Sequence, residues 1–292
     1  MRIGPVVERY RLRTTFWSLV VFQLVCSLTR AQPPRLVTVF DERQDEMSYD
    51  ISARYEPQVR GPVTLTIRVD LTNMSSNRSI PLNVVLSEEG VFRLLNVRRT
   101  DPRARWNFHY DSHWQYGDMR ARHRAQIVYS LPFAPGQRFE VTQGFNSSFS
   151  HNGAGAFAVD FAMLEGTPVR AARGGRVVWT RNDVTTTVRL KPPGQNDSIP
   201  ANEVVILHDD GTVGWYMHFR PGGVAVPIGS FVREGDIVGM SGDTGLSSQP
   251  HLHFEVYKPA DGYVRQTIPV RFHVKGETRP IQLQEGRFYE PR

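Results

Sequence analysis

Two histidines in the C-terminal part of the chain have the residue type and spacing needed for metal chemistry. His251 and His253 lie in the segment Gln249–Val256, which reads QPHLHFEV. If this segment is a β-strand, residues two apart point to the same face, so both imidazole rings project together while Leu252 and Phe254 face the core. Two imidazoles on one side of a rigid strand make half of a good zinc site.

Three further polar residues could complete such a site. His151 is flanked by small residues in an expected loop, where its ring can reach outward. Asp160 lies in the apolar segment 157–162, where a buried carboxylate is costly unless it is paired, and a cation would pair with it. His218 stands in the otherwise apolar and aromatic segment Trp215–Phe219.

Together these segments resemble the lysostaphin-type zinc metallopeptidases, the LytM-like or β-lytic family of cell-wall endopeptidases. The family pattern is a His followed by an Asp, then a Tyr-x-His strand and a closing His-x-His strand. The corresponding segments of this chain read SHNGAGAFAVD, WYMHF and QPHLHFEV, and the supporting framework segments read EGTPV, AARGG, VREGD and SGDTG. The resemblance covers roughly residues 137–272, and the order of its motifs is more specific than any single motif.

The resemblance implies roles for five residues. His151, Asp160 and His253 would be the ligands of one Zn²⁺ per chain. His218 and His251 would be catalytic histidines that do not bind the metal. The chain departs from the family at one point, because eight residues lie between His151 and Asp160 whereas many relatives have three there. A small glycine-containing loop is thus inserted between these two ligands, and His151 has the least support from the motif.

This residue set predicts hydrolysis of a peptide bond. Two His and one Asp leave the fourth position of tetrahedral zinc for water, and zinc lowers the pKa of that water toward ~7, which gives a nucleophile at neutral pH. A neutral imidazole at His218 or His251 can accept its proton, and the protonated ring can stabilise the oxyanion or protonate the leaving amine. The family implies that the substrate is the peptide cross-links of bacterial peptidoglycan, so the expected partners are its stem peptides.

Two other functions remain open at this point. Some relatives lose metal ligands and activate cell-wall amidases without catalysis, but all five expected positions are filled in this chain. A peptidase of secreted proteins or Gly-rich peptides is also compatible with the motifs, because the expected pocket walls are loops such as the polar insertion Asn182–Asn202. Digestion of intact sacculi and of a Gly-rich peptide would separate these substrates.

The N-terminal segment predicts export. Residues 1–31 contain an arginine-rich stretch, the apolar run Phe16–Leu28 and small residues before a cleavage point after Ala31, which is the layout of a secretory signal peptide. The apolar run is too short to cross a membrane core of ~30 Å, so we expect cleavage rather than a retained anchor, and no membrane span in the mature chain. Cys26, the only cysteine, lies in this run. Neither disulfides nor thiol catalysis are therefore expected, which suits a periplasmic or secreted bacterial protein.

The charge distribution argues against nucleic-acid binding. The chain carries 35 basic and 29 acidic residues, a formal charge of +6, and residues 1–31 contribute +4 of it. The remaining residues have 30 basic and 28 acidic side chains. A nearly balanced mature chain has no strong phosphate-binding field. The composition leaves the oligomeric state open.

The elements that position the candidate residues are expected to be β-strands throughout. Residues 32–135 alternate apolar and polar positions and predict an antiparallel β-sandwich-like domain, which either covers the groove as an inhibitor or binds a partner or glycan. Residues 136–292, after a linker at Pro132–Gly136, predict a second all-β domain with antiparallel strands. The resemblance implies that it is a metallopeptidase domain with a groove, of the duplicated hybrid motif type. The expected strands are Val63–Leu71, Leu82–Leu86, Val91–Val97, Ala125–Leu131, Gly175–Thr180, Glu203–His208, Trp215–Phe219, Ile237–Gly239 and Leu252–Tyr257.

Three other histidines and one acidic residue have simpler interpretations. His109 and His113 are expected to be surface or packing residues with a turn at residues 111–112 between them. His208 ends an expected strand and is interpreted as structural. Glu255 has two open interpretations: it orients a ligand histidine, or it is an exposed strand residue.

Overall fold

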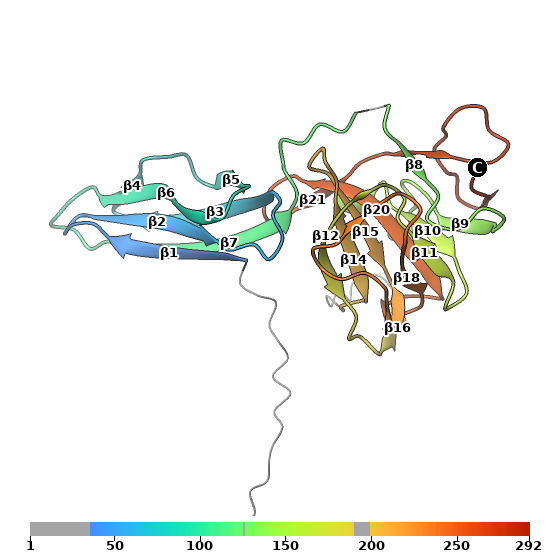
Figure 1. Cartoon of the computed structure of the whole chain (residues 1–292). Helices are drawn as coiled ribbons and strands as arrows, with labels where there is room; N and C mark the ends of the chain where they lie inside the picture. Colours follow the sequence, from blue (N-terminus) through green and yellow to red (C-terminus); the bar gives the residue numbers. More distant parts are fainter. Residues whose placement is uncertain (1–35, 125, 190–198) are drawn as a thin grey trace, which may run out of the picture. The chain divides into compact units, whose positions relative to one another are not determined.

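Strands supply almost all of the regular structure. The computed structural model describes residues 36–124, 126–189 and 199–292. Within these ranges the helical structure is one 3-10 turn, η1 (Gly153–Gly155), and the other elements are β-strands (Figure 1), which confirms the all-β fold class. No helix in these ranges is long and apolar enough to cross a membrane. The expected signal segment, residues 1–31, and the central part of the expected insertion lie outside the described residues.

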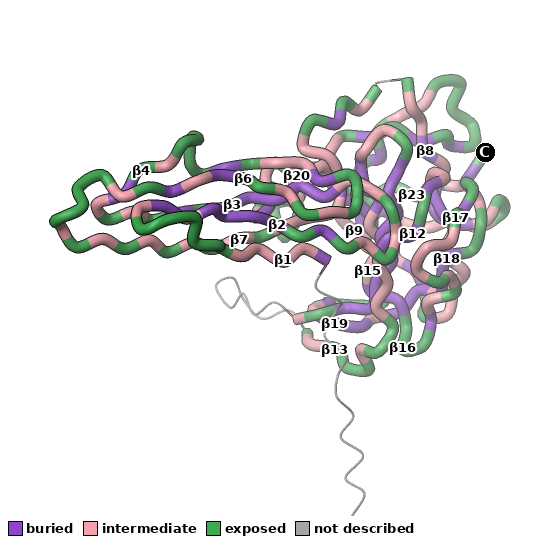
Figure 2. The backbone as a smooth tube through the Cα atoms, turned by 60° about the vertical axis from the view of Figure 1, so that its left-hand side comes forward, coloured by how far each residue is buried: buried purple, intermediate pink, exposed green. Residues whose placement is uncertain are grey.

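The first seven strands form two antiparallel sheets with a shared core. These strands are β1 (Val37–Arg43), β2 (Ser48–Tyr55), β3 (Val63–Thr72), β4 (Met74–Ser76), β5 (Leu82–Leu86), β6 (Gly90–Arg99) and β7 (Asn107–Tyr116). One sheet has the order β1-β2-β6-β4 and the other β5-β3-β7, and the three strands expected here are present as β3, β5 and β6. Apolar side chains of both sheets, such as Ile51, Leu65 and Leu95, belong to one buried cluster. Figure 2 shows the buried positions along β2, β3 and β6.

Strand β7 differs from the sequence expectation. It runs unbroken over Asn107–Tyr116 and pairs with β3 along its whole length, so the turn expected at residues 111–112 is wrong. The long ladder to β3 satisfies the backbone hydrogen bonds of these two residues, and this outweighs their local preference for a turn. His109 and His113 are exposed, as expected. They stand four residues apart on an extended strand, about 13 Å, which is too far to share a metal ion.

The remaining strands are organised around one nine-stranded antiparallel sheet. They are β8 (Val128–Ser130), β9 (Phe139–Gln143), β10 (Val159–Ala162), β11 (Pro168–Arg170), β12 (Gly175–Arg181), β13 (Thr187–Val188), β14 (Glu203–Leu207), β15 (Val213–Met217), β16 (Phe219–Val224), β17 (Phe231–Val232), β18 (Ile237–Ser241), β19 (Gly245–Leu246), β20 (His251–Pro259), β21 (Arg265–Thr267), β22 (Arg271–His273) and β23 (Phe288–Tyr289). The large sheet has the order β17-β12-β14-β15-β20-β10-β9-β23, with β21 paired to β20. Three small sheets accompany it: β11-β18-β16, β13-β19 and β22-β8.

Alternation along β20 decides which side chains enter the core. Leu252, Phe254 and Val256 are buried in the main apolar cluster of this half of the chain. Residues between them on an extended strand point to the opposite face, so His251 and His253 project together on that face. The strands expected over Gly175–Thr180, Glu203–His208, Ile237–Gly239 and Leu252–Tyr257 are present as β12, β14, β18 and β20.

The strand expected over Trp215–Phe219 is interrupted. β15 ends at Met217, because His218 has a positive φ of 69° that breaks the extended backbone before β16 begins. The expectation of one continuous strand here is therefore wrong. The break turns the His218 side chain out of the alternation of β15.

The segment before the expected linker contributes to the core of the large sheet. The strand expected over Ala125–Leu131 is the three-residue β8, which pairs in parallel with β22. Tyr129, Leu131 and Phe133 are buried in the same cluster as Phe254. Side chains on both sides of the linker thus pack in one apolar core.

Candidate metal centre

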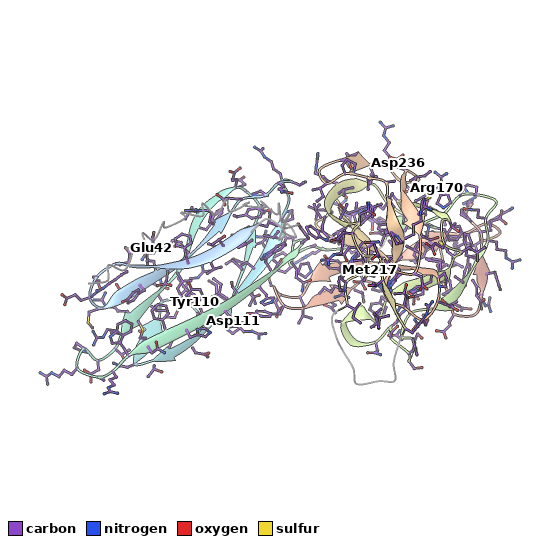
Figure 3. The ribbon with its side chains drawn as sticks, turned by 90° about the horizontal axis from the view of Figure 1, so that it is seen from below. Glu42, Tyr110, Asp111, Arg170, Met217 and Asp236 are labelled. Atoms are coloured by element: carbon purple, nitrogen blue, oxygen red, sulfur yellow. The ribbon has the colours of Figure 1, made fainter. Side chains whose placement is uncertain are left out.

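The pairing of β10 with β20 brings two candidate ligands together. Their antiparallel register places Asp160 opposite His253, and residues directly opposite in such a pair stand on one face with Cβ atoms about 5 Å apart. His253 Nδ1 lies 2.8 Å from Asp160 Oδ1. Met217, labelled in Figure 3, is the register partner of His253 on β15. Strands on both sides therefore fix the backbone of His253.

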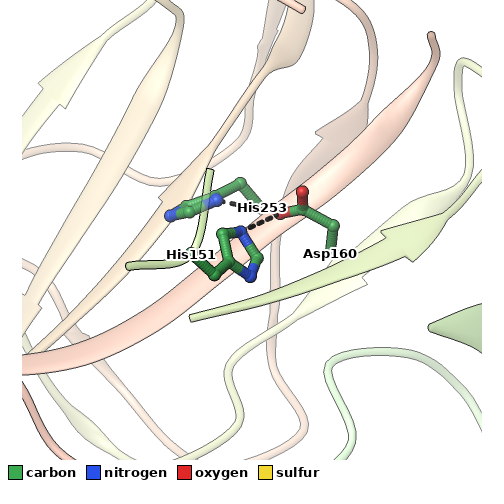
Figure 4. A group of neighbouring side chains, drawn as sticks. All are labelled: His151, Asp160 and His253. Atoms are coloured by element: carbon green, nitrogen blue, oxygen red, sulfur yellow. Dashed lines mark hydrogen bonds and ion pairs between the residues drawn. The ribbon is translucent and has the colours of Figure 1, made fainter. Parts of the chain in front are cut away.

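His151 reaches the same carboxylate from the loop between β9 and β10. Its Nε2 lies 3.3 Å from Asp160 Oδ1. Its Nδ1 lies 3.2 Å from the carbonyl oxygen of Gly144, which can only accept a hydrogen bond, so Nδ1 carries a proton and Nε2 is the ring nitrogen available to a metal. This buried Nε2 has no hydrogen-bond partner among the described residues. Figure 4 shows the His151 and His253 side chains converging on Asp160.

The three side chains fit a zinc ion. Their ligand atoms, two imidazole nitrogens and one carboxylate oxygen, all lie within 4.8 Å of one another. Tetrahedral zinc binds such atoms at about 2.0–2.2 Å, which separates the ligand atoms by about 3.4 Å. The distances of 3.3 and 2.8 Å from the His151 and His253 nitrogens to Asp160 Oδ1 are close to that separation. His151 Nε2, for which the described residues provide no hydrogen-bond partner, is the atom that a metal ion would satisfy.

The candidate ligands are electrostatically coupled. Burial alone would raise the pKa of Asp160, but its contacts with His151 and His253 outweigh burial and hold that pKa well below its usual range. Burial lowers the pKa of His253, whereas hydrogen bonds with Asp160 and Glu255 raise it, and the net result is a pKa of about 9. In the metal-free protein at neutral pH, His253 is a cation between two carboxylates. A metal ion must therefore displace a proton to bind it.

Glu255 contacts His253 through the second ring nitrogen. Its Oε2 lies 3.3 Å from His253 Nε2, and its Oε1 accepts a hydrogen bond from Arg265 Nε at 2.5 Å. Because a carboxylate only accepts, His253 keeps a proton on Nε2 and Nδ1 is the nitrogen available to a metal. Glu255 is 1% exposed. The interpretation of Glu255 as an exposed residue is wrong, because both faces of β20 are covered at this point.

The other two histidines stand beside the candidate ligands. The ring centroid of His218 lies 4.5 Å from that of His251 and 6.2 Å from that of His253. His218 Nδ1 donates to the Thr244 carbonyl and His251 Nδ1 to the Gln249 carbonyl, each at 2.7 Å. These bonds leave Nε2 of both rings as the free nitrogen. Burial and the neighbouring His251 lower the pKa of His218 to about 3, so its ring is neutral.

The backbone of His218 is held in a strained conformation. A φ of 69° lies in the left-handed region, which costs a non-glycine residue ~1–3 kcal/mol unless surrounding contacts impose it. Thr244 supplies two such contacts, because its carbonyl accepts from the His218 ring and its hydroxyl donates to the Phe219 carbonyl at 2.7 Å. Strain of this kind clusters at functional sites. It points the His218 ring toward the candidate ligands.

A pocket of about 390 Å³ opens onto this group. Asp160, His218, His251 and His253 form part of its wall. Most of the other lining side chains are small hydroxyl or amide groups; they are Thr142, Gln143, Ser147, Ser148, Ser150, Ser247, Ser248 and Gln249, with Phe149, Leu246 and Glu285. The wall can therefore make many hydrogen bonds to an extended peptide.

Gln143 is a residue of this site that the sequence analysis missed. It ends β9 and pairs in register with Asp160 on β10, and its Nε2 donates to Asp160 Oδ2 at 2.6 Å. The only sequence signal is a polar residue at the end of the strand FEVTQ. That signal does not reveal the partner, because the contact depends on the register between two strands.

His208 is buried apart from the candidate ligand group. Its Nδ1 donates to the Gly174 carbonyl at 2.9 Å. Burial lowers the pKa of His208 to about 4, so the ring is neutral. These observations agree with its interpretation as a structural residue.

The chain matches one known protein family over part of its length. Residues 154–266 match the Peptidase family M23 model. This confirms the resemblance to the lysostaphin-type metallopeptidases that the motifs indicated. The matched range contains Asp160, His218, His251 and His253, whereas His151 precedes it.

Individual relatives are similar over the same part of the chain. The glycyl-glycine endopeptidase ALE-1 of Staphylococcus capitis is 38% identical over 108 residues, which are 36% of this chain and 25% of ALE-1. The peptidoglycan DD-endopeptidase ShyA of Vibrio cholerae is 36% identical over 106 residues, 36% of this chain and 20% of ShyA. The chain thus spans a quarter or less of the length of these relatives. A solved structure of lysostaphin from Staphylococcus simulans aligns over 44% of this chain and 47% of that chain, with 27% identity and a TM-score of 0.32.

Proposed function

We propose that the chain, whose residues 154–266 match the Peptidase family M23 model, is a zinc metalloendopeptidase that hydrolyses peptide cross-links of bacterial peptidoglycan. The observation that carries this proposal is the convergence of His151, Asp160 and His253, whose ligand atoms lie within 4.8 Å of one another. The names of ALE-1 and ShyA, a glycyl-glycine endopeptidase and a peptidoglycan DD-endopeptidase, support the substrate class.

In this proposal His151, Asp160 and His253 hold one zinc ion. When bound, zinc would act as a Lewis acid and lower the pKa of its bound water toward ~7. The contact of His151 Nδ1 with Gly144 and that of His253 Nε2 with Glu255 each fix the opposite ring nitrogen as the metal-facing atom. The ligand geometry is therefore prepared before the metal arrives.

His218 and His251 are proposed as the proton-transfer residues. Each ring donates its Nδ1 proton to a backbone carbonyl and so has a free Nε2 beside the ligands. That nitrogen can accept a proton from the attacking water. Once protonated, it can donate a hydrogen bond to the developing oxyanion or return the proton to the leaving amine.

The wall of the pocket supports an extended peptide as substrate. Hydroxyl and amide side chains such as Ser247 and Gln249 can pair with peptide N–H and C=O groups.

We further propose that the mature chain acts in the periplasm or outside the cell, where peptidoglycan is found. Residues 1–31, whose composition is that of a signal peptide, would direct this export and then be removed.

A peptidase of Gly-rich peptides is the second candidate. The specific observation in its favour is the 38% identity to a glycyl-glycine endopeptidase. The non-catalytic activator of amidases has less support, because the activators lack ligands whereas His151, Asp160 and His253 are all present and adjacent in this chain.

The proposal is tested by metal analysis of the purified mature chain combined with digestion of cross-linked muropeptides and a Gly-rich peptide. We expect one zinc per chain, cleavage that a chelator abolishes, and loss of zinc in His253→Ala. Zinc that persists at full stoichiometry in that variant would overturn the ligand assignment. Stoichiometric zinc without cleavage of either substrate would overturn the peptidase activity and favour the activator.

A further inference from the structure

Gln143 contacts both of the segments that carry the first two candidate ligands. Its side-chain Nε2 donates to Asp160 Oδ2 at 2.6 Å. Its Oε1 accepts from the backbone N–H of Ser150 at 3.2 Å and from the Ser150 hydroxyl at 2.9 Å. Ser150 is the residue before His151. One amide group therefore links the β10 carboxylate to the loop that carries the histidine.

The chemistry of the partners determines the orientation of the amide. An ionised carboxylate only accepts hydrogen bonds, and a backbone N–H only donates them. The NH₂ group of Gln143 must therefore face Asp160 and its carbonyl must face Ser150. The reverse orientation would place oxygen against oxygen at Asp160 and N–H against N–H at Ser150, so the amide assignment is unambiguous.

The hydrogen bond from Gln143 occupies one of the two carboxylate oxygens of Asp160. Gln143 occupies Oδ2, whereas Oδ1 faces His151 Nε2 at 3.3 Å and His253 Nδ1 at 2.8 Å. The carboxylate can then offer a metal one oxygen in a fixed direction. A side chain without the amide would leave Oδ2 without this hydrogen bond and the direction of Oδ1 less restricted.

The contact with Ser150 fixes the start of the loop that joins His151 to Asp160. His151 is separated from Asp160 by eight residues, which include the turn η1. Gln143 ties the start of this loop through Ser150, and the neighbouring Gly144 carbonyl binds His151 Nδ1 at 3.2 Å. Adjacent residues at the end of β9 thus place both the His151 backbone and its ring. This compensates for the long spacing between the two ligands.

We propose that Gln143 is a positioning residue of the metal centre, which sets the direction of Asp160 Oδ1 and anchors the loop of His151 with one amide group. The inference rests on the proposed zinc-binding function. Hydrogen-bonding partners of metal ligands typically contribute ~10–100-fold to metal affinity. Gln143 contacts one ligand and the chain segment of a second, so an effect in this range is expected.

The test replaces Gln143 by Met, which has a similar unbranched shape but neither amide donor nor acceptor. Gln266→Met makes the same chemical change at an exposed position of β21 in the same sheet and is the matched control. Zinc affinity is measured by competition with a chromophoric chelator. The visible absorption spectrum of the Co²⁺-substituted protein reports ligand geometry, and thermal unfolding of the metal-free chains reports stability.

We expect Gln143→Met to weaken zinc binding by about 10–100-fold and to change the Co²⁺ spectrum, with an unfolding midpoint of the metal-free chain equal to that of the control. Zinc affinity within twofold of the control, or an unchanged Co²⁺ spectrum, would overturn the inference. Loss of metal-free folding in Gln143→Met and in the smaller variant Gln143→Ala would also overturn it, because Gln143 would then act on the fold in general. Zinc binding by the natural chain without peptide cleavage would refute the proposed peptidase and leave the role of Gln143 standing.

Discussion

Zinc binding is expected to release a proton near neutral pH. In the metal-free protein, the contacts with Asp160 and Glu255 outweigh burial and raise the pKa of His253 to about 9. The protonated ring therefore predominates below pH 9, and raising the pH favours the form that binds metal. Because pH 7 is about two units below the pKa of His253, removal of the ring proton reduces the free energy of zinc binding by about 2.7 kcal/mol. The apparent zinc affinity should rise nearly tenfold from pH 7 to pH 8 and level off above pH 9.

Two measurements check this prediction. Calorimetric titration of the metal-free chain with zinc at pH 7, in buffers of different ionisation enthalpy, should show release of about one proton from this site. Chelator competition at pH 7, 8 and 9.5 should give the affinity profile. An affinity that stays constant across this range, or zinc binding with no proton release at pH 7, would refute the assignment of His253 Nδ1 as a ligand that is protonated in the metal-free protein.

Two substitutions test other parts of the site, and a third tests a hydrogen bond in the core. Glu255→Gln should weaken zinc binding about 10–100-fold at pH 9.5, because the His253 ring loses its ionised partner; equal affinity in a chelator competition would contradict this. His218→Asn, in which Asn tolerates the left-handed backbone, should retain zinc and lower kcat by about 10²–10⁴-fold, and full activity on muropeptides would exclude His218 from proton transfer. Tyr216→Phe should lower the free energy of unfolding by about 1–3 kcal/mol, measured by denaturant titration, because the buried Tyr216 hydroxyl accepts from the Ala172 N–H at 2.8 Å; an unchanged unfolding free energy would show that this bond contributes nothing.

Local pattern was sufficient to predict several of the strands, and the resemblance of the motifs to a known family implied which residues are the candidate ligands. The alternation in β20 placed His251 and His253 on one face and Leu252 in the core, and the structure has this arrangement. The polar residue Asp160 in an apolar strand was likewise a local signal. Such signals are visible in one segment because side-chain direction on a strand repeats every two residues.

The pattern within a segment did not predict a residue's conformation or burial where contacts with other segments determine it. The turn expected at residues 111–112 does not form, because pairing with β3 keeps β7 extended. Glutamate is a residue type that is usually exposed, yet Glu255 is buried, because Arg265 pairs with it and the strands around β20 cover it. The left-handed backbone of His218 depends in turn on contacts with Thr244, which lies 26 residues further along the chain.

The sequence by itself determined an all-β chain and the residue types of a candidate zinc site. Only the tertiary structure decided how these residues meet. Asp160 and His253 are 93 residues apart, and the register of β10 with β20 makes them neighbours. The register of β9 with β10 does the same for Gln143 and Asp160. Register depends on the summed backbone pairing and core packing of whole strands, whereas a sequence pattern reports only which face each residue occupies.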